Sequence, residues 1–192
     1  MRSLSLLARL VPLAALATAA ACGGDGGTTP DPKLTLSQVS GVYNVCSLKF
    51  QPNQTALPTA NLLATVVNPA PPAPKQAPSL TVSSQAAGYQ LLYTRRSDNF
   101  TQDLRSPLSL GTEDIVLTVP DETTSDVRNE LLLPAQLRLR FTASPRTLTA
   151  LPDFFYTVRR SDYARAAGIS EEGLADRITG LLSATFSTGS CA

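Results

Sequence analysis

The sequence predicts an all-β protein: a single antiparallel β-barrel of about eight to ten strands, with one short helix near the C-terminus. From residue 34 onward, short runs of alternating apolar and polar side chains are separated by turn residues, which is typical of antiparallel sheets. The cleanest alternation is in residues 136–142, where Leu and Phe fill one face and Arg138 and Arg140 the other. A strand with one apolar, buried face and one polar, solvent-exposed face belongs in a single-layered sheet or a barrel wall.

Ten segments have strand character: 40–50, 60–68, 80–84, 89–96, 108–110, 114–119, 136–142, 146–151, 154–160 and 177–186. The clearest hairpin joins 80–84 to 89–96, because the turn between them contains Gly88. The Pro-rich residues 69–78 lack the amide donors that a sheet interior needs, so we expect an extended surface loop there. The acidic, polar residues 121–129 are expected to form a solvated loop.

Residues 161–176 are the one helical candidate. Ser170 is placed as an N-cap with two glutamates after it, and Gly168 or Gly173 limits the length of the helix. In the final strand the apolar residues share one face, and Gly180 marks a bend or a close approach of another chain segment.

The chain contains three cysteines, Cys22, Cys46 and Cys191. In an oxidising compartment Cys46 and Cys191 can form a disulfide that encloses about 145 residues. The alternative is two separate buried thiols. A disulfide would place the first and last strands side by side, and this arrangement favours a closed barrel because closure removes both sheet edges.

Residues 1–21 have the layout of a secretory signal peptide. Arg2 and Arg9 supply positive charge, and an apolar run of about 12 residues follows, shorter than the roughly 20 that span a bilayer. A run of three alanines then ends directly before Cys22. The predicted destination is therefore outside the cytoplasm, and residues 34–192 form the predicted barrel domain.

The small residues before Cys22 and the glycines after it resemble the lipobox of bacterial lipoproteins, although Ala19 stands where lipoboxes favour Leu. The resemblance implies that residues 1–21 are removed and that Cys22 carries a lipid. Secretion with an unmodified Cys22 is the alternative. Residues 22–33 are rich in Gly, Thr and Pro after the cysteine, a composition typical of a flexible tether. Because such a tether suits a domain held away from a membrane surface, it favours the lipoprotein over the secreted protein. The predicted location is the bacterial cell envelope, membrane-anchored through Cys22 and facing the periplasm or the cell exterior.

The start of the first predicted strand, Gly41-Val42-Tyr43, resembles the Gly-x-aromatic start of lipocalin-like domains, which more typically carry Trp at the aromatic position. The resemblance implies a small barrel that binds a small apolar ligand in its mouth. A barrel of this size can also be filled by its own side chains. The alternative function is therefore a structural or assembly lipoprotein that acts through protein–protein contacts.

The absence of histidine excludes Ser-His-Asp and Cys-His catalysis and imidazole metal sites. Removing residues 1–21 takes Arg2 and Arg9 from the 16 basic side chains, so 14 basic and 15 acidic side chains remain. This balance offers no electrostatic basis for binding nucleic acid. The sequence thus predicts a protein that is not an enzyme, has no cofactor and has no metal site.

The motif Tyr-Thr-Arg-Arg-Ser-Asp at 93–98 recurs at 156–162 with one inserted residue. Two strand ends with paired guanidinium groups could form a rim that binds a carboxylate or a phosphate. The rim residues would be Arg95, Arg96, Arg159 and Arg160. The alternative is two similar strand ends whose arginines pair with nearby acids, Asp98 and Asp162 included.

Overall fold

The computed structural model describes residues 33–66, 78–121, 126–152 and 154–191. The chain divides into two units, Met1–Pro30 and Asp31–Ala192, and all described residues belong to the second. The predicted signal peptide and Cys22 lie outside the described residues. Of the predicted Pro-rich loop, Pro78 alone lies inside them.

Within the described residues there are ten strands and four helices. They follow one another in the order α1 (Leu36–Val39), β1 (Gly41–Pro52), β2 (Ala60–Asn61), α2 (Leu63–Val66), β3 (Ser79–Val82), β4 (Gly88–Thr94), β5 (Thr101–Leu110), β6 (Asp114–Thr118), α3 (Val127–Glu130), β7 (Gln136–Ala143), β8 (Arg146–Ala150), β9 (Tyr156–Arg159), α4 (Arg160–Ala167) and β10 (Arg177–Ser187).

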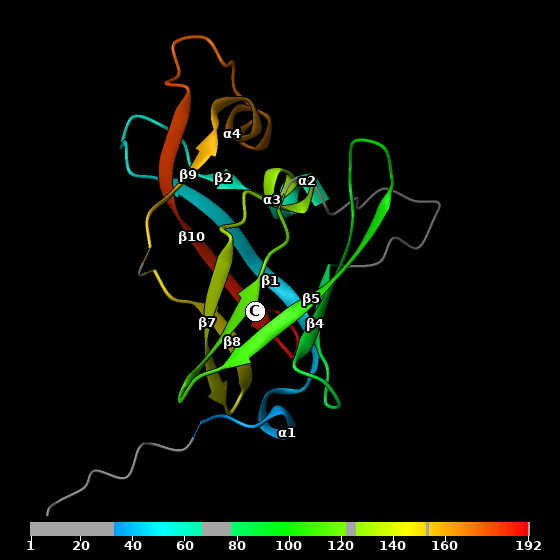
Figure 1. Ribbon diagram of the computed structural model, residues 1–192. Coiled ribbons are helices and arrows are strands. Elements are labelled where there is room, and N and C mark those ends of the chain that lie inside the picture. Colours follow the sequence, from blue (N-terminus) through cyan, green and yellow to red (C-terminus); the bar gives the residue numbers. More distant parts are fainter. Residues whose placement is uncertain (1–32, 67–77, 122–125, 153, 192) are drawn as a thin grey trace, which may run out of the picture. The chain divides into compact units, whose positions relative to one another are not determined.

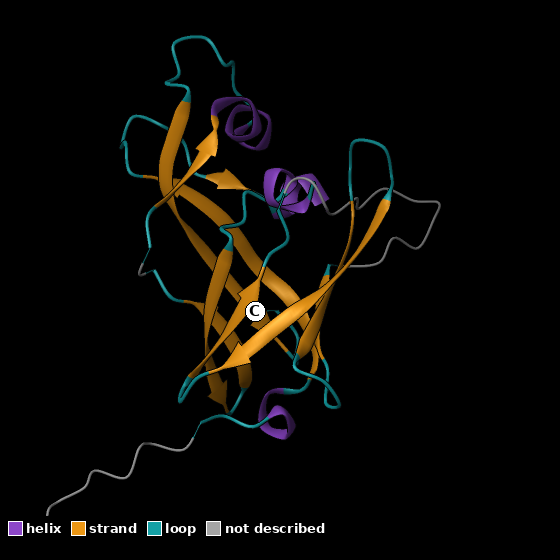
Figure 2. Cartoon of the chain, in the orientation of Figure 1, coloured by secondary structure: helices purple, strands orange, loops and turns teal. Residues whose placement is uncertain are grey.

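Eight of the strands form a closed antiparallel barrel (Figures 1 and 2). They are hydrogen-bonded in the order β1-β3-β4-β5-β6-β7-β8-β10, and β1 also pairs with β10. The short strands β2 and β9 extend this sheet from β1 and β10 at one end of the barrel. The predicted all-β class, the single antiparallel barrel and its strand number are confirmed.

The seam between β1 and β10 closes the barrel and carries the predicted disulfide. The two strands pair from Asn44 opposite Ser187 to Pro52 opposite Gly180. The register shifts at Cys46, and this bulge moves the buried positions of β1 from odd to even residue numbers. The Cys46 side chain is bonded to Cys191, with their Cα atoms 5.1 Å apart. The disulfide prediction is confirmed, and so is the prediction that the first and last strands are neighbours.

Two predicted strands have wrong bounds. The segment 60–68 forms a strand over its first two residues, and α2 follows, so the predicted long strand is replaced by one helical turn. The predicted brief strand at 108–110 is the end of β5, which has ten residues. Gln102 and Ser106 share the inward face of β5 with the buried Leu104 and Leu108, and these polar residues interrupted the apolar pattern.

The C-terminal helix is shorter than predicted and begins earlier. It is α4, and it ends at Gly168, which adopts the left-handed conformation at φ 68° and ψ 35°. Ser170 was predicted to be an N-cap, and this is wrong: its hydroxyl accepts a hydrogen bond from the Glu172 backbone N–H (3.1 Å) outside any helix. The predicted loop at 121–129 includes most of α3, because Val127 is fully buried and holds that turn against the barrel.

The helix α1 covers the end of the barrel where β1 begins (Figure 1). Val39 is fully buried there, and its carbonyl accepts a hydrogen bond from the Tyr43 hydroxyl (2.6 Å). The Arg146 guanidinium at the start of β8 donates to the carbonyl of Ser37 (3.3 Å) and to that of Gln38. These contacts fix the point at which the chain enters the barrel. Among the described residues, no helix is long and apolar enough to cross a membrane.

All five tyrosines of the chain donate a hydrogen bond through the hydroxyl group, four of them to a backbone carbonyl and Tyr93 to Glu130. Burial raises the pKa of each phenol above its ordinary value of 10.0, and that of Tyr89 reaches about 12. The folded barrel therefore keeps its tyrosines neutral at a pH where exposed tyrosines ionise.

We expect no tyrosinate absorbance from the folded protein at pH 10, where an exposed tyrosine is about half ionised. Each phenol has a higher pKa in the folded protein than in the unfolded chain, so keeping it neutral contributes to the stability of the fold. This contribution is complete below pH 10 and is lost as the pH rises through the folded-state pKa. All five phenols should then ionise together as the protein unfolds. An ultraviolet pH titration followed alongside circular dichroism tests this, and the absence of Trp keeps the signal clear. A phenol that ionises near pH 10 in the folded protein would contradict the prediction.

Candidate functional site

The interior of the barrel is filled by its own side chains. The space left between them is about 20 Å³ and is lined by apolar side chains and tyrosine rings, including Leu80, Leu91 and Leu117. Such a space holds about one water molecule. Binding sites for small molecules are usually several hundred cubic ångströms. A ligand of that size therefore has no room between the strands of this conformation.

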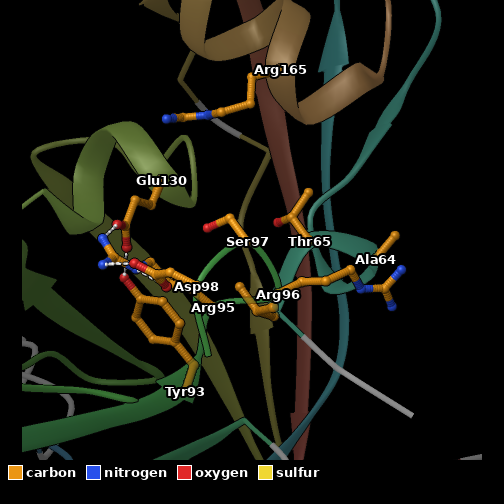
Figure 3. Close-up of a pocket in the computed structure, with 10 residues that line it drawn as sticks. Ala64, Thr65, Tyr93, Arg95, Arg96, Ser97, Asp98, Glu130 and Arg165 are labelled. Carbon is orange, nitrogen blue, oxygen red and sulfur yellow. Dashed lines mark hydrogen bonds and ion pairs between the residues drawn. The ribbon is translucent and has the colours of Figure 1, made fainter. Parts of the chain in front are cut away.

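A larger pocket, the mouth pocket, is lined by residues of α2, α3 and α4, which lie at the end of the barrel opposite α1 (Figure 1). Figure 3 shows its lining side chains. Its volume is about 350 Å³. Four elements contribute to its wall: α2, the end of β4 with the turn that follows, α3 and α4. The strand β4 leads from Tyr89, which is paired with β3 near α1, to Thr94 directly before the pocket. The point of chain entry and the mouth pocket are thus at opposite ends of β4.

The turn after β4 is held by backbone hydrogen bonds, which place its side chains at the pocket. The Arg95 N–H donates to the Phe100 carbonyl (2.9 Å), and Asn99 adopts a left-handed φ of 62° inside the turn. The Arg96 N–H donates to the Thr65 carbonyl of α2 (2.9 Å). The turn and α2 therefore form one continuous wall.

A charged group, the Arg95 cluster, occupies one side of the mouth pocket (Figure 3). The Arg95 guanidinium donates to both carboxylates of the cluster, Glu130 and Asp98, and the Tyr93 hydroxyl also donates to Glu130. The Arg95 guanidinium lies 5.0 Å from the centre of the Phe100 ring. The Glu130 side chain is only 12% exposed, so its ion pair with Arg95 is shielded from water.

Hydrogen bonds and burial shift the pKa values of three groups in this cluster. Hydrogen bonds from Arg95 to Glu130 and to Asp98 raise the pKa of Arg95 above its usual range. The hydrogen bond from the Phe100 backbone N–H makes the largest contribution to lowering the pKa of Asp98, and the hydrogen bond from Arg95 lowers it further. Burial and the hydrogen bond to Glu130 raise the pKa of Tyr93. Both carboxylate oxygens of Glu130 accept a hydrogen bond within the cluster, so the cluster holds the turn against α3 and shapes the pocket wall.

The structure separates the four arginines of the predicted rim. Arg95 and Arg96 line the mouth pocket, and the Arg96 side chain extends toward α2 (Figure 3). Arg159 lines a second pocket on another side of α3. Arg160 pairs with Glu171 (3.8 Å) and Asp176 (3.4 Å). The two sequence repeats therefore do not meet at one anion site, and the Arg95–Asp98 ion pair agrees with the alternative of local pairing.

Sequence reasoning missed Glu130 and Arg165. Glu130 lies 35 residues from its partner Arg95, directly after the predicted loop at 121–129. Arg165 reaches the mouth pocket from α4, where it pairs with Asp162 (3.0 Å) and donates to the Asn129 carbonyl (3.0 Å). No local pattern in the sequence marks either residue, because the pairing depends on where α3 and α4 pack on the barrel.

Over the described ranges, no three His, Cys, Asp or Glu residues lie close enough together to hold a metal ion. The chain was also compared with known proteins. No protein-family model, curated protein or solved structure matches it. The lipobox and lipocalin resemblances therefore stay predictions.

Proposed function

We propose that this protein is a lipid-anchored protein of the bacterial cell envelope whose barrel is a binding module. The ligand is a small molecule with an apolar part, and it binds in the mouth pocket. The observation that carries the proposal is the position and size of that pocket. Its volume of about 350 Å³ lies within the usual range for small-molecule sites, and the filled barrel interior leaves no comparable space between the strands.

The lining of the mouth pocket supports an amphipathic ligand. Ala64, Val66 and the Tyr93 ring supply apolar surface. Arg96 and Arg165 bring positive charge to the same pocket, and Ser97 adds a hydroxyl group. Apolar surface with a few polar groups is the common composition of ligand sites, in which the polar groups fix orientation. A short apolar body with one anionic or polar end fits this lining.

The predicted anchor suits this geometry. The described chain starts at Lys33, next to α1, and the mouth pocket lies at the other end of the barrel. An anchor at Cys22 would therefore hold the barrel by the end that lacks the pocket. Residues 22–32 could span at most about 40 Å if fully extended. A tether of this length would allow the mouth pocket to face the periplasm or the cell exterior.

The experiment is a titration of the protein with anilinonaphthalene sulfonate, a fluorescent probe with an apolar body and one anionic group. We expect wild-type protein to enhance its fluorescence and Ala64→Trp to bind it at least about tenfold more weakly, a factor that corresponds to ~1.4 kcal/mol. Ala64 is exposed on α2 and lines the pocket, so the indole fills the site without entering the barrel core.

Ala175→Trp is the matched control, because Ala175 is exposed in a loop and does not line the mouth pocket. Equal probe binding by the two tryptophan variants would exclude the mouth pocket as the binding site. The anchor is tested in the same preparations by cell fractionation. We expect wild-type protein in the membrane fraction and Cys22→Ser in the soluble fraction. Wild-type protein that fails to partition with membranes would exclude the anchor.

The second candidate function is a structural or assembly role. The filled barrel interior favours it, and so do two adjacent phenylalanines before β9, Phe154 and Phe155, which are 62% and 63% exposed. Exposed aromatic side chains are common anchors of protein–protein contacts. Crosslinking in intact cells distinguishes the candidates. A crosslinked partner that is lost in Phe154→Ser and kept in Ala64→Trp would favour assembly over ligand binding.

A further inference from the structure

A second pocket, the arginine pocket, lies on the side of α3 that faces β9 and the start of β10. Its volume is about 480 Å³. Three arginines from three different elements line it: Arg128 of α3, Arg159 of β9 and Arg177 of β10. The mouth pocket and the arginine pocket share no lining residue. A ligand of the arginine pocket is therefore independent of the function proposed above.

Arg159 and Arg177 are direct partners across the antiparallel pair β9–β10. Directly opposite residues place their side chains on the same face, with Cβ atoms about 5 Å apart, and like charges in these positions destabilise a sheet. Both side chains are exposed. An anion held between or above the two guanidinium groups would offset the repulsion between them. The register therefore brings two guanidinium groups to the same face at the arginine pocket.

Within the described chain, one acidic residue lines this pocket against three arginines. It is Asp162, and its carboxylate already pairs with Arg165 (3.0 Å). The nearby acids Glu171 and Asp176 pair with Arg160. Arg128 and Arg177 form no ion pair with any described residue. The arginine pocket thus gathers more positive charge than its described neighbours neutralise.

We propose that the arginine pocket binds a phosphate group through Arg128, Arg159 and Arg177. A phosphate monoester carries about −1.5 to −2 charges near pH 7 and three acceptor oxygens, which suits three guanidinium groups better than a carboxylate with one charge does. The exposed Phe155 ring and Pro134 line the same pocket and offer apolar surface beside the charge. The ligand class is therefore a phosphate-bearing molecule with an apolar portion, either a lipid headgroup or a soluble phosphate ester.

Inorganic phosphate is the first probe, titrated by calorimetry at low ionic strength into the full chain carrying Cys22→Ser, which excludes any acyl group from the measurement. We expect binding that weakens at least about tenfold in Arg177→Gln, because the substitution removes a charge-assisted hydrogen bond to the phosphate. The same substitution removes the like-charge pair, so Arg177→Gln should unfold at an equal or higher temperature than its parent. Lost binding in a protein of undiminished stability cannot result from misfolding.

Arg140→Gln is the matched control, because Arg140 is exposed on β7 and does not line the pocket, and the change in net charge is the same. Vesicles of phosphatidylcholine with and without phosphatidic acid, a lipid that carries a phosphate monoester, identify the source of the phosphate. Arg177-dependent binding to the vesicles that contain phosphatidic acid, and not to phosphatidylcholine alone, indicates a lipid headgroup. Phosphate binding without vesicle binding indicates a soluble ester. Equal phosphate affinity in Arg177→Gln and Arg140→Gln, or no phosphate binding by the parent chain, would overturn the proposal.

Discussion

Replacing Cys46 and Cys191 together by serine is expected to lower the free energy of unfolding by up to about 5 kcal/mol. The disulfide joins residues 145 positions apart, which encloses most of the barrel in one covalent loop. In the chain-entropy model, a cross-link across a loop of this length restricts the unfolded chain by roughly that amount. The folded barrel should change little, because the backbone pairing of β1 with β10 does not depend on the sulfur atoms.

Urea denaturation measures this difference, with Cys22→Ser present in every protein so that no third thiol takes part. Reductant should destabilise the protein with both cysteines and should leave the double serine variant unchanged. A difference below about 1 kcal/mol between the oxidised protein and the serine variant would show that the loop contributes little. The unfolded chain would then have to be compact enough for the cross-link to restrict it only slightly.

Gly180→Ala is expected to lower the free energy of unfolding by about 2–3 kcal/mol. A methyl group on Gly180 would lie 2.4 Å from the Gln51 carbonyl oxygen and 2.5 Å from Cζ of Phe50. Neither neighbour can move easily, because Gln51 is paired in the β1–β10 ladder and the buried Phe50 ring packs against Tyr156, 5.4 Å between ring centres. Overpacking a tight site typically costs 1–3 kcal/mol.

Whether Gly180→Ala lowers or raises the free energy of unfolding shows whether β1 approaches β10 closely at this residue. In the interior of a strand, Gly is normally less stable than Ala by roughly 0.5–1 kcal/mol, so a position without the close approach would be stabilised. Gly189→Ala is the control, because its methyl group would meet no atom closer than 3.7 Å. Chemical denaturation should place Gly189→Ala within about 0.5 kcal/mol of the wild type. Equal stability of the two variants would mean that β1 and β10 are not in close contact at this glycine.

The helix α3 connects the two candidate sites. Glu130 at its end completes the Arg95 cluster of the mouth pocket, and Arg128 points to the arginine pocket on the other side. The Asn129 carbonyl between them accepts a hydrogen bond from Arg165 of α4. A four-residue helix thus contributes to both sites because it packs through the buried Val127 at the open end of the barrel.

The strand pattern could be predicted wherever one face of a strand is apolar throughout. Residues 136–142 and the hairpin at 80–96 are of this kind, and β7, β3 and β4 have nearly the predicted bounds. The pattern was insufficient for β5, where polar residues share the inward face, and for α2, whose four residues are too short for a helical period to be recognised. Short elements of this kind form because the surrounding barrel packs against them.

The sequence by itself determined the all-β class, because alternation along a strand depends on residue type, and it favoured the closed barrel and the Cys46–Cys191 disulfide over two separate thiols. At Gly180 it predicted a bend or a close approach, and the structure shows the close approach. Only the tertiary structure decided which charges meet. The pairing of Arg95 with Glu130 and the register that places Arg159 opposite Arg177 depend on barrel closure and on helix packing. Local sequence carries no signal for ion pairs and charge clusters between residues that are far apart in the chain, so both candidate sites became visible only in the folded barrel.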